Sequence, residues 1–269
     1  MRFSPWVDVA VRAAREAGHV LMDRFVRPPR PGEVRYKGRV NPVTEADEAA
    51  EACIVSLLRE AFPDHAIVAE EGGGHESDAR WRWYVDPLDG TTNFAHRLPW
   101  FGVSLALAEG DEVLVGVVYH PVLDELFVAE RGAGAWAVRG KVVERLQVSK
   151  TISLQYALVG TGTPTDIGIT GNNLPQIVTM LKVTEDVRQM GSAAINLCSV
   201  AAGRLDAFWE PDLNPWDVAA GALMVLEAGG TVTGIDGSPY VAGTRSPLAT
   251  NGQLHRQMLA LLSTGGPVR

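Results

Sequence analysis

The chain has 269 residues, a length that fits one large domain or two modest ones and that folds without a disulfide or structural metal. Hydrophobic residues make up 46% and charged residues 21%, and the formal net charge is −8. This acidic balance argues against nucleic acid or an anionic membrane surface as the main partner. A phosphorylated substrate stays possible, because bound divalent cations can reverse the local field.

The composition also indicates a compartment. Charged residues interrupt any apolar run near the N-terminus, so we expect no secretory signal. No stretch approaches the roughly 18 apolar residues that a membrane span needs. Cys53 and Cys198 lie far apart in apolar helical patterns, without the histidine spacing of a zinc site. We therefore expect a cytoplasmic protein with reduced, buried thiols and no membrane partner.

The first part of the chain predicts helices that cover one face of a sheet. Apolar residues at helical spacing predict helices over 5–27 and 44–62, the first opened by Ser4-Pro5. Strands are expected at 66–69 and 81–85, the second ending at the following aspartate. The stretch 101–148 alternates short apolar runs with turns, which predicts an antiparallel meander.

After about residue 150 the pattern changes to alternating strands and helices. Strands are expected at 156–159, at 205–209 and near Thr231 and Leu248, and helices at 174–181, 191–202, 215–227 and 253–262. No repeat or linker separates the halves, so we expect one layered unit with a soft boundary. Residues 1–150 would form an α+β half with metal-binding motifs and an antiparallel sheet, and residues 151–269 an α/β half that completes the site.

The most informative segment is Asp86-Pro87-Leu88-Asp89-Gly90-Thr91-Thr92-Asn93-Phe94. Two carboxylates follow a strand, three residues apart. The backbone N–H groups after them open a short helix, which is a ready anion site. Carboxylates would repel a phosphate unless hard cations lay between them, and oxygen ligands select Mg²⁺ or Mn²⁺ rather than zinc. Taken alone, the segment is equally compatible with an acidic turn whose aspartates cap a helix.

Other acids strengthen the metal interpretation. Glu70-Glu71 follows a short apolar strand, and Asp217 begins a helix. Each one alone could be a solvated charge or a partner of the helix dipole. Together with Asp86 and Asp89 they form three sets of acids at strand ends and helix starts, where α/β sheets bind ligands.

These motifs resemble those of the inositol monophosphatase family of Mg²⁺-dependent, lithium-sensitive phosphatases. The resemblance runs from about residue 7 to residue 262. It implies a layered αβαβα sandwich of the α/β (α+β) class, and a homodimer. The matching segments are Glu70-Glu71, Asp86–Phe94, Gly191–Ala194, Trp216–Gly221 and Glu227–Gly230, together with Lys37, Thr44 and Asp47 near the N-terminus.

The resemblance implies two to three bound Mg²⁺ ions, for which Mn²⁺ could substitute. Glu70, Asp86 and the Leu88 carbonyl would bind the first ion. Asp86, Asp89 and Asp217 would bind the second, with Asp86 bridging, and Glu70 would also help to hold a third, weaker ion. Two such metals can bind both the attacking and the leaving oxygen of an in-line displacement.

The resemblance also implies catalytic and substrate contacts. Thr91, its hydroxyl held by Asp47, would orient the attacking water, and Glu70 would share in activating it. The Gly90 and Thr91 amides would bind phosphate oxygens. On the alcohol side the resemblance implies contacts from Asp89, Ala193 and Glu210.

Asp47 has a second interpretation, because Thr44-x-x-Asp47 also matches a capping box. In that motif the acid bonds the backbone at the helix start. A carboxylate has two oxygens, so one residue could serve both roles.

The substrate is less well defined than the metal chemistry. Asn41-Pro42 departs from the inositol-specific pattern, and other branches of the superfamily accept proline there. The stretch 161–186 matches loosely and holds Lys182 as its one basic residue, which favours a small polyol phosphate such as myo-inositol 1-phosphate. The alternatives are the same chemistry on fructose 1,6-bisphosphate, histidinol phosphate or 3′-phosphoadenosine 5′-phosphate, or an idle scaffold. The complete set of acids argues against a scaffold.

Overall fold

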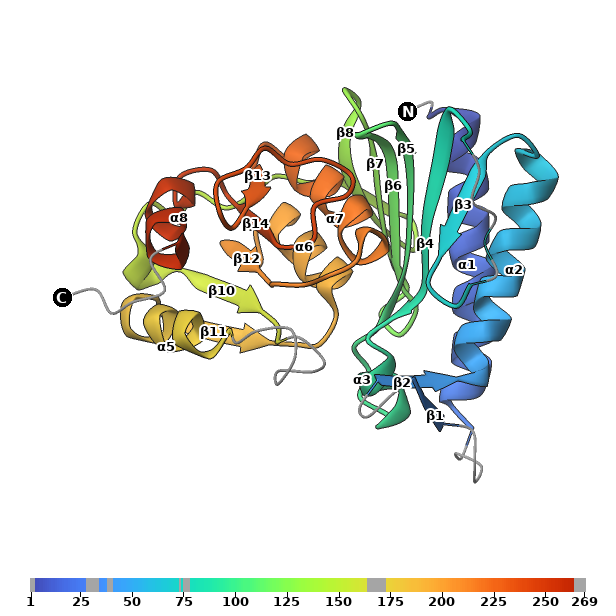
Figure 1. Cartoon of the computed structure of the whole chain (residues 1–269), viewed down its shortest axis with the longest axis horizontal. Coiled ribbons are helices and arrows are strands. Elements are labelled where there is room, and N and C mark those ends of the chain that lie inside the picture. The colour runs from blue at the N-terminus through green and yellow to red at the C-terminus, as the bar shows by residue number, and fades with distance from the viewer. Residues whose placement is uncertain are drawn as a thin grey trace.

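The computed structural model describes residues 3–27, 34–37, 41–72, 74, 78–163 and 173–263, with the backbone alone for 34–37, 41–43 and 263. Helices and sheets alternate in the predicted αβαβα order (Figure 1). Two long helices cover the large sheet, two lie between the sheets, and two cover the far side of the small sheet. In that order these are α1 (Pro5–Phe25), α2 (Glu45–Ala61), α6 (Ala193–Ala201), α7 (Pro215–Glu227), α5 (Leu174–Val183) and α8 (His255–Ser263).

The large sheet confirms the predicted meander. Its strands lie in chain order, the first pair parallel and all the others antiparallel. Short turns between neighbours enforce that arrangement. The strands are β3 (Ala66–Ala69), β4 (Trp81–Asp89), β5 (Gly102–Glu109), β6 (Glu112–His120), β7 (Glu125–Glu130), β8 (Gly134–Arg139) and β9 (Val142–Arg145).

Strand β4 is longer than predicted, because it continues past Asp86 to Asp89. Asp86 pairs with Ser104 and Asp89 with Gly102, so β4 carries one extra residue between these pairs. Such a bulge lets the ladder resume while it redirects side chains. The predicted strand end is therefore wrong. The bulge lies between the two aspartates in the last part of β4, and both residues line one cleft.

The small sheet has the strand order β11-β10-β12-β14-β13, with β10 parallel to both of its neighbours. The predicted strand at 156–159 is displaced, since a 3₁₀ turn over Leu154–Tyr156 precedes it. Three further elements were not predicted as such: β11, and a separate antiparallel pair, β1 with β2. The strands are β10 (Leu158–Thr161), β11 (Asp186–Gln189), β12 (Ala207–Trp209), β13 (Thr231–Gly234), β14 (Pro247–Thr250), β1 (Val34–Lys37) and β2 (Asn41–Thr44).

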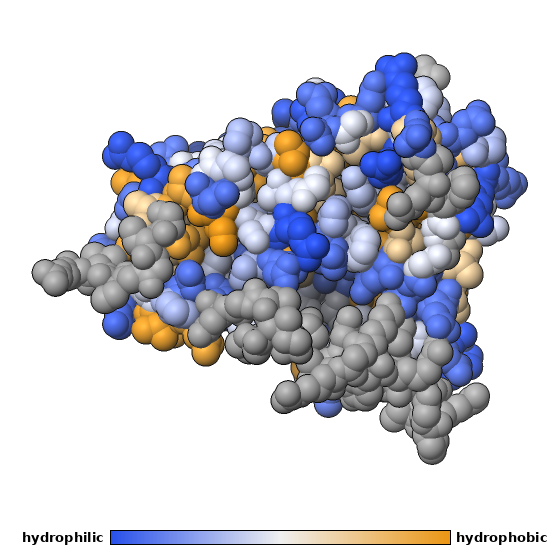
Figure 2. Space-filling view, in the orientation of Figure 1, coloured by the Kyte–Doolittle hydropathy of each residue, from blue (hydrophilic) through white to orange (hydrophobic). Residues whose placement is uncertain are grey.

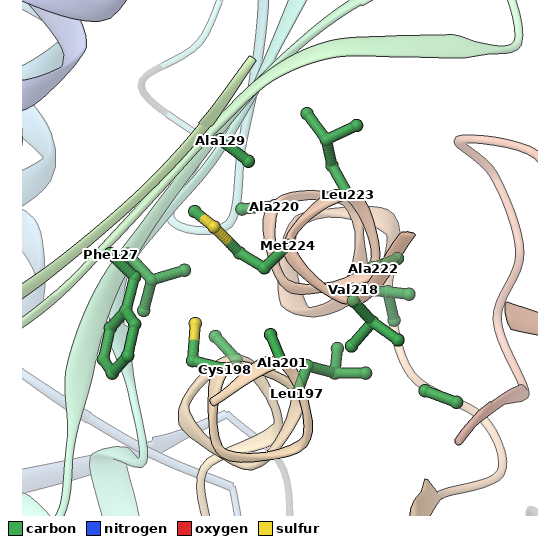
Figure 3. Close-up of a cluster of buried hydrophobic side chains, with 14 of the residues drawn as sticks. Phe127, Ala129, Leu197, Cys198, Ala201, Val218, Ala220, Ala222, Leu223 and Met224 are labelled. Carbon is green, nitrogen blue, oxygen red and sulfur yellow. The ribbon is translucent and has the colours of Figure 1, made fainter. Parts of the chain in front are cut away.

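One cluster of buried hydrophobic side chains lies where α6 and α7 pack between the sheets (Figure 3). Helix α7 is buried on all sides from Val218 to Val225, as expected for a helix covered by a sheet on each face. Glycines permit the close approach: a Cβ on Gly116 would lie 2.7 Å from a backbone oxygen of α7, and one on Gly221 would lie 2.5 Å from the Leu197 Cβ. Cys198 is buried in this layer, whereas Cys53 is only half-buried.

The described surface is mixed. Large hydrophobic side chains are exposed on α5, at Leu174, Val178 and Leu181, and hydrophobic residues gather toward the α5 and α8 end in Figure 2. Among the helices of the described residues, none has the length and apolar character that crossing a bilayer requires.

Candidate active site

A cleft of about 620 Å³ lies where β4, the start of α6, the end of β12 and the start of α7 meet. The short helix α3 (Thr91–Ala95) forms one wall. All but one of the predicted site residues line this cleft, although they come from segments up to about 150 positions apart. They are Glu70, Asp86, Leu88, Asp89, Gly90, Thr91, Ala193, Glu210 and Asp217.

Three of the predicted acids form a tight cluster. Carboxylate oxygens of Glu70, Asp86 and Asp217 all lie within 4.8 Å of one another. Each acid comes from a different element: Glu70 follows β3, Asp86 is in β4, and Asp217 is in the first turn of α7. Two backbone amides fix the orientations, because Leu88 donates to Asp86 Oδ1 at 2.9 Å and Asn214 donates to Asp217 Oδ2 at 2.7 Å.

The electrostatics of this cluster favour a cation. Burial, together with the charges of Glu70, Asp89 and Asp217, raises the pKa of Asp86 well above its ordinary value. Burial and the charge of Asp89 raise the pKa of Asp217 to about 7. Buried like charges are costly unless a counter-ion neutralises them. The donor atoms are all oxygens, which fits a hard cation such as Mg²⁺.

Asp89 lies in the same cleft but has a different set of partners. Its Oδ2 accepts hydrogen bonds from Ser192 Oγ at 2.6 Å and from the Ala194 amide at 2.7 Å, and its Oδ1 accepts from the Ala193 amide at 3.3 Å. Asp89 thus caps the start of α6 and ties that helix to β4. Burial raises its pKa to about 6 against these hydrogen bonds, which lower it. The Ala193 amide, predicted to face the substrate, here contacts Asp89.

Asp47 makes both of the contacts expected of it, one that caps α2 and one to the Thr91 hydroxyl. One oxygen, Oδ2, accepts from the Thr44 amide at 2.8 Å and from the Thr44 hydroxyl at 2.5 Å, which caps α2. The other, Oδ1, accepts from the Thr91 hydroxyl at 3.2 Å. Thr91 Oγ1 also lies 3.0 Å from the Leu88 carbonyl oxygen. A fully buried carboxylate therefore holds the Thr91 hydroxyl, and burial raises the pKa of Asp47 to about 6.

Two positioning residues had no role assigned from sequence. Asn93 Nδ2 donates to the carbonyls of Trp100 and Met190, each at 2.8 Å, which joins α3 to the turn before α6. Ser192 is the N-cap of α6 as well as a donor to Asp89. Both lie inside segments that match the family motifs, but their partners are remote in sequence, so local spacing alone could not assign them.

Glu210 also lines the cleft and comes directly after β12. Burial raises the pKa of its carboxyl, and the charges of Asp89 and Asp217 raise it further. Within the described part of the chain, no side chain donates a hydrogen bond or supplies a cation to this carboxylate. Glu210 is only partly buried and lines the cleft, so its carboxylate is accessible to a ligand.

The raised pKa values predict how stability depends on pH. Asp86, Asp89 and Asp217 hold protons more tightly in the folded than in the unfolded chain. Their contribution to stability is thus complete below about pH 4. For Asp89 and Asp217 it is lost as pH rises through about 6 to 7. We expect the Tm of chelator-treated protein to fall across this range, and Mg²⁺ to raise Tm more at about pH 8 than at about pH 5. Thermal unfolding with and without Mg²⁺ measures both effects, and a Tm at pH 8 that ignores Mg²⁺ would contradict the cation site.

Comparison with known proteins agrees with this geometry. The profile of the inositol monophosphatase family matches residues 3–265. An inositol-1-monophosphatase from Synechocystis sp. is 42% identical over 269 residues, covering 97% of this chain and 91% of that protein. A Nus factor, SuhB, from Pseudomonas aeruginosa is 45% identical over 240 residues, covering 87% of each chain.

A solved structure extends the likeness to the whole fold. The inositol monophosphatase from Anabaena (Nostoc) sp. superposes with a TM-score of 0.86 at 38% identity, covering 98% of this chain and 97% of that one. Because the family profile and these relatives span nearly the whole chain, the protein belongs to the inositol monophosphatase family and is a phosphatase.

Proposed function

We propose that the protein is a Mg²⁺-dependent phosphomonoesterase that hydrolyses myo-inositol 1-phosphate or a related small polyol phosphate to the alcohol and inorganic phosphate. The observation that carries this proposal is the cluster of Glu70, Asp86 and Asp217, which shares one cleft with the backbone at the start of α3. The Synechocystis relative, named an inositol-1-monophosphatase, supports the choice of substrate class.

The donor set suits two or three divalent cations. Glu70, Asp86 and the Leu88 carbonyl would hold one Mg²⁺, and Asp86, Asp89 and Asp217 a second, with Glu70 near a third, weaker ion. A carboxylate offers about four acceptor sites, so Asp89 can cap α6 and still face an ion. When bound, the ions supply an activated water and neutralise charge on the leaving oxygen.

The chain's own groups orient the reactants. The Thr91 hydroxyl, held by Asp47, would accept or donate to the attacking water and fix its approach to phosphorus. The first amides of a helix have no intrahelical acceptor, so those of Gly90 and Thr91 would bind phosphate oxygens. Gly90 has a φ of +100°, and a Cβ there would lie 3.0 Å from the Trp100 carbonyl oxygen, so this turn suits glycine.

The cleft also supports a small alcohol. No lysine or arginine is among the described residues that line it. A bisphosphate or a nucleotide would place a second anion in this acidic cleft without a cationic side chain to receive it. Glu210 would instead accept hydrogen bonds from alcohol hydroxyls, with Asp89 and the Ala193 amide alongside. We further propose a cytoplasmic homodimer that lithium inhibits, as the family resemblance implies.

Phosphate release from a panel of esters tests the proposal. The panel is inositol 1-phosphate, fructose 1,6-bisphosphate, histidinol phosphate and 3′-phosphoadenosine 5′-phosphate, each with and without Mg²⁺. We expect preference for inositol 1-phosphate, dependence on Mg²⁺ and suppression by lithium. Preference for another ester would overturn the substrate while leaving the chemistry, and no release from any of the four would contradict the proposed function.

A further inference from the structure

Gly162 and Glu210 lie next to each other, just beyond the ends of two neighbouring parallel strands. Thr161, the last residue of β10, pairs in register with Trp209, the last residue of β12. The next residues along the two strands are Gly162 and Glu210, and both line the cleft. The register therefore places the Glu210 side chain beside the Gly162 backbone.

The carboxylate of Glu210 occupies the space that a side chain at position 162 would fill. A Cβ on Gly162 would lie 2.1 Å from the Glu210 Cδ, 2.1 Å from Oε1 and 2.2 Å from Oε2. The φ of Gly162 lies outside the left-handed region that favours glycine. Its φ therefore gives no reason for glycine, and what a side chain at position 162 would meet is the Glu210 carboxylate.

The Gly162 backbone is held firmly in that place. Asn173 Nδ2 donates to the Gly162 carbonyl at 2.6 Å and lies 2.9 Å from Thr161 Oγ1. Asn173 Oδ1 accepts from the Trp209 indole at 2.8 Å, and the Thr161 hydroxyl donates to the Trp209 carbonyl at 2.7 Å. The side chains of Thr161, Asn173 and Trp209 are buried, so the Gly162 backbone cannot move away from Glu210 without breaking buried hydrogen bonds. A side chain at position 162 would displace the Glu210 carboxylate instead.

We propose that Gly162 is a specificity-determining residue. The space beside its backbone, called the seat below, holds the Glu210 carboxylate where it can contact hydroxyl groups of the alcohol. Asn173, Thr161 and Trp209 act as positioning residues, because they hold the Gly162 backbone against that carboxylate. The inference rests on the proposed function for the identity of the ligand, but the seat itself is a property of the fold.

Gly162→Ala tests the seat, with Gly243→Ala as the matched control. Gly243 is exposed and has an ordinary φ, and a Cβ added there would meet no atom within 4 Å. We expect Gly162→Ala to lower kcat/KM for inositol 1-phosphate about tenfold, the loss of one hydrogen bond to a charged group. Hydrolysis of p-nitrophenyl phosphate, which has no alcohol hydroxyls, should change less than about twofold. Gly243→Ala should change neither ester.

A double variant separates the seat from a general packing effect. Glu210→Ala alone should lower kcat/KM for inositol 1-phosphate relative to p-nitrophenyl phosphate, as Gly162→Ala does. Adding Gly162→Ala to it should have no further effect, because the Glu210 carboxylate is already gone. This double variant also removes the steric conflict, so it folds even if the single variant does not. Additive losses, or equal losses on both esters, would overturn the inference.

A crystal structure of Gly162→Ala keeps this test independent of the proposed function. If the unmodified protein does not prefer inositol 1-phosphate to p-nitrophenyl phosphate, the proposed function fails and kinetics no longer report on the seat. The inference then requires the Glu210 carboxylate of the variant to have left its position beside residue 162. A carboxylate in its original position would overturn the inference whatever the enzyme hydrolyses.

Discussion

Asp86→Asn is expected to lower kcat by about a thousandfold or more, since cation binding at such a site supplies several kcal/mol of charge stabilisation. Asp86 is the buried centre of the acid cluster, and its carboxylate is the predicted bridge between two ions. Asparagine keeps the shape and can still accept from the Leu88 amide. The fold should survive, and the metal-free Tm should equal or exceed that of the unmodified protein, because one buried charge is removed.

Asp236→Asn is the matched control for this substitution. Asp236 is an exposed turn residue whose Oδ1 accepts from the Ser238 amide, and it lies outside the cleft. Its variant should retain activity. Steady-state phosphate release and thermal unfolding, measured on both variants, separate lost chemistry from lost structure. Full activity in Asp86→Asn would refute the metal scheme.

Thr91→Ala is expected to lower kcat by about two to four orders of magnitude, the range typical for loss of a positioned proton-transfer group. The methyl group cannot orient water, whereas Thr91→Ser keeps the hydroxyl within reach of Asp47 Oδ1 and should retain most of the activity. KM should change less than kcat, because the hydroxyl acts on the reacting water rather than on the bound alcohol. Equal activity in the alanine and serine variants would contradict this role.

The double role of Asp47 offers the control for Thr91→Ala. Thr44→Ala removes the side-chain part of the α2 cap and leaves the contact between Asp47 and Thr91 in place. It should cost about 0.5–2 kcal/mol of unfolding free energy with little loss of kcat. Thr91→Ala should instead lower kcat with little change in the free energy of unfolding. Denaturant unfolding and steady-state kinetics, measured on both variants, test whether the two contacts of Asp47 can be separated in this way.

Much of the fold could be predicted because local signals mark many elements. Helix α7 has its predicted bounds, since Pro215 suits the first turn and Gly229-Gly230 the stop. The meander from β5 to β9 follows from short turns between apolar runs. Strand β11 has no such signal: three of its four residues, Asp186–Gln189, are polar and all four are at least partly exposed, so no alternation of buried and exposed residues marks it.

The candidate site, like the fold, could be predicted from the sequence only in part. The acids of the cluster could be selected because Glu70 and Asp86 each follow an apolar strand pattern in the sequence and Asp217 opens a helix, although β4 itself runs on to Asp89. The hydrogen bonds that Asp89 accepts from Ser192 and Ala194 join residues more than 100 positions apart, and no local pattern encodes them. The bulge in β4 depends likewise on pairing with β5. Tertiary contacts, rather than local propensity, therefore decide which acids cluster and which one caps a helix.

The most direct test of the central claim is the response of phosphate release to Mg²⁺. Inositol 1-phosphate is offered to the chelator-treated protein and to Asp86→Asn while Mg²⁺ is added back stepwise. We expect the unmodified protein to be inactive without the ion and to regain activity in a saturable manner, and the variant to stay inactive throughout. Release that is unaffected by chelation, or a variant that regains the same activity, would contradict a phosphatase built on Glu70, Asp86 and Asp217.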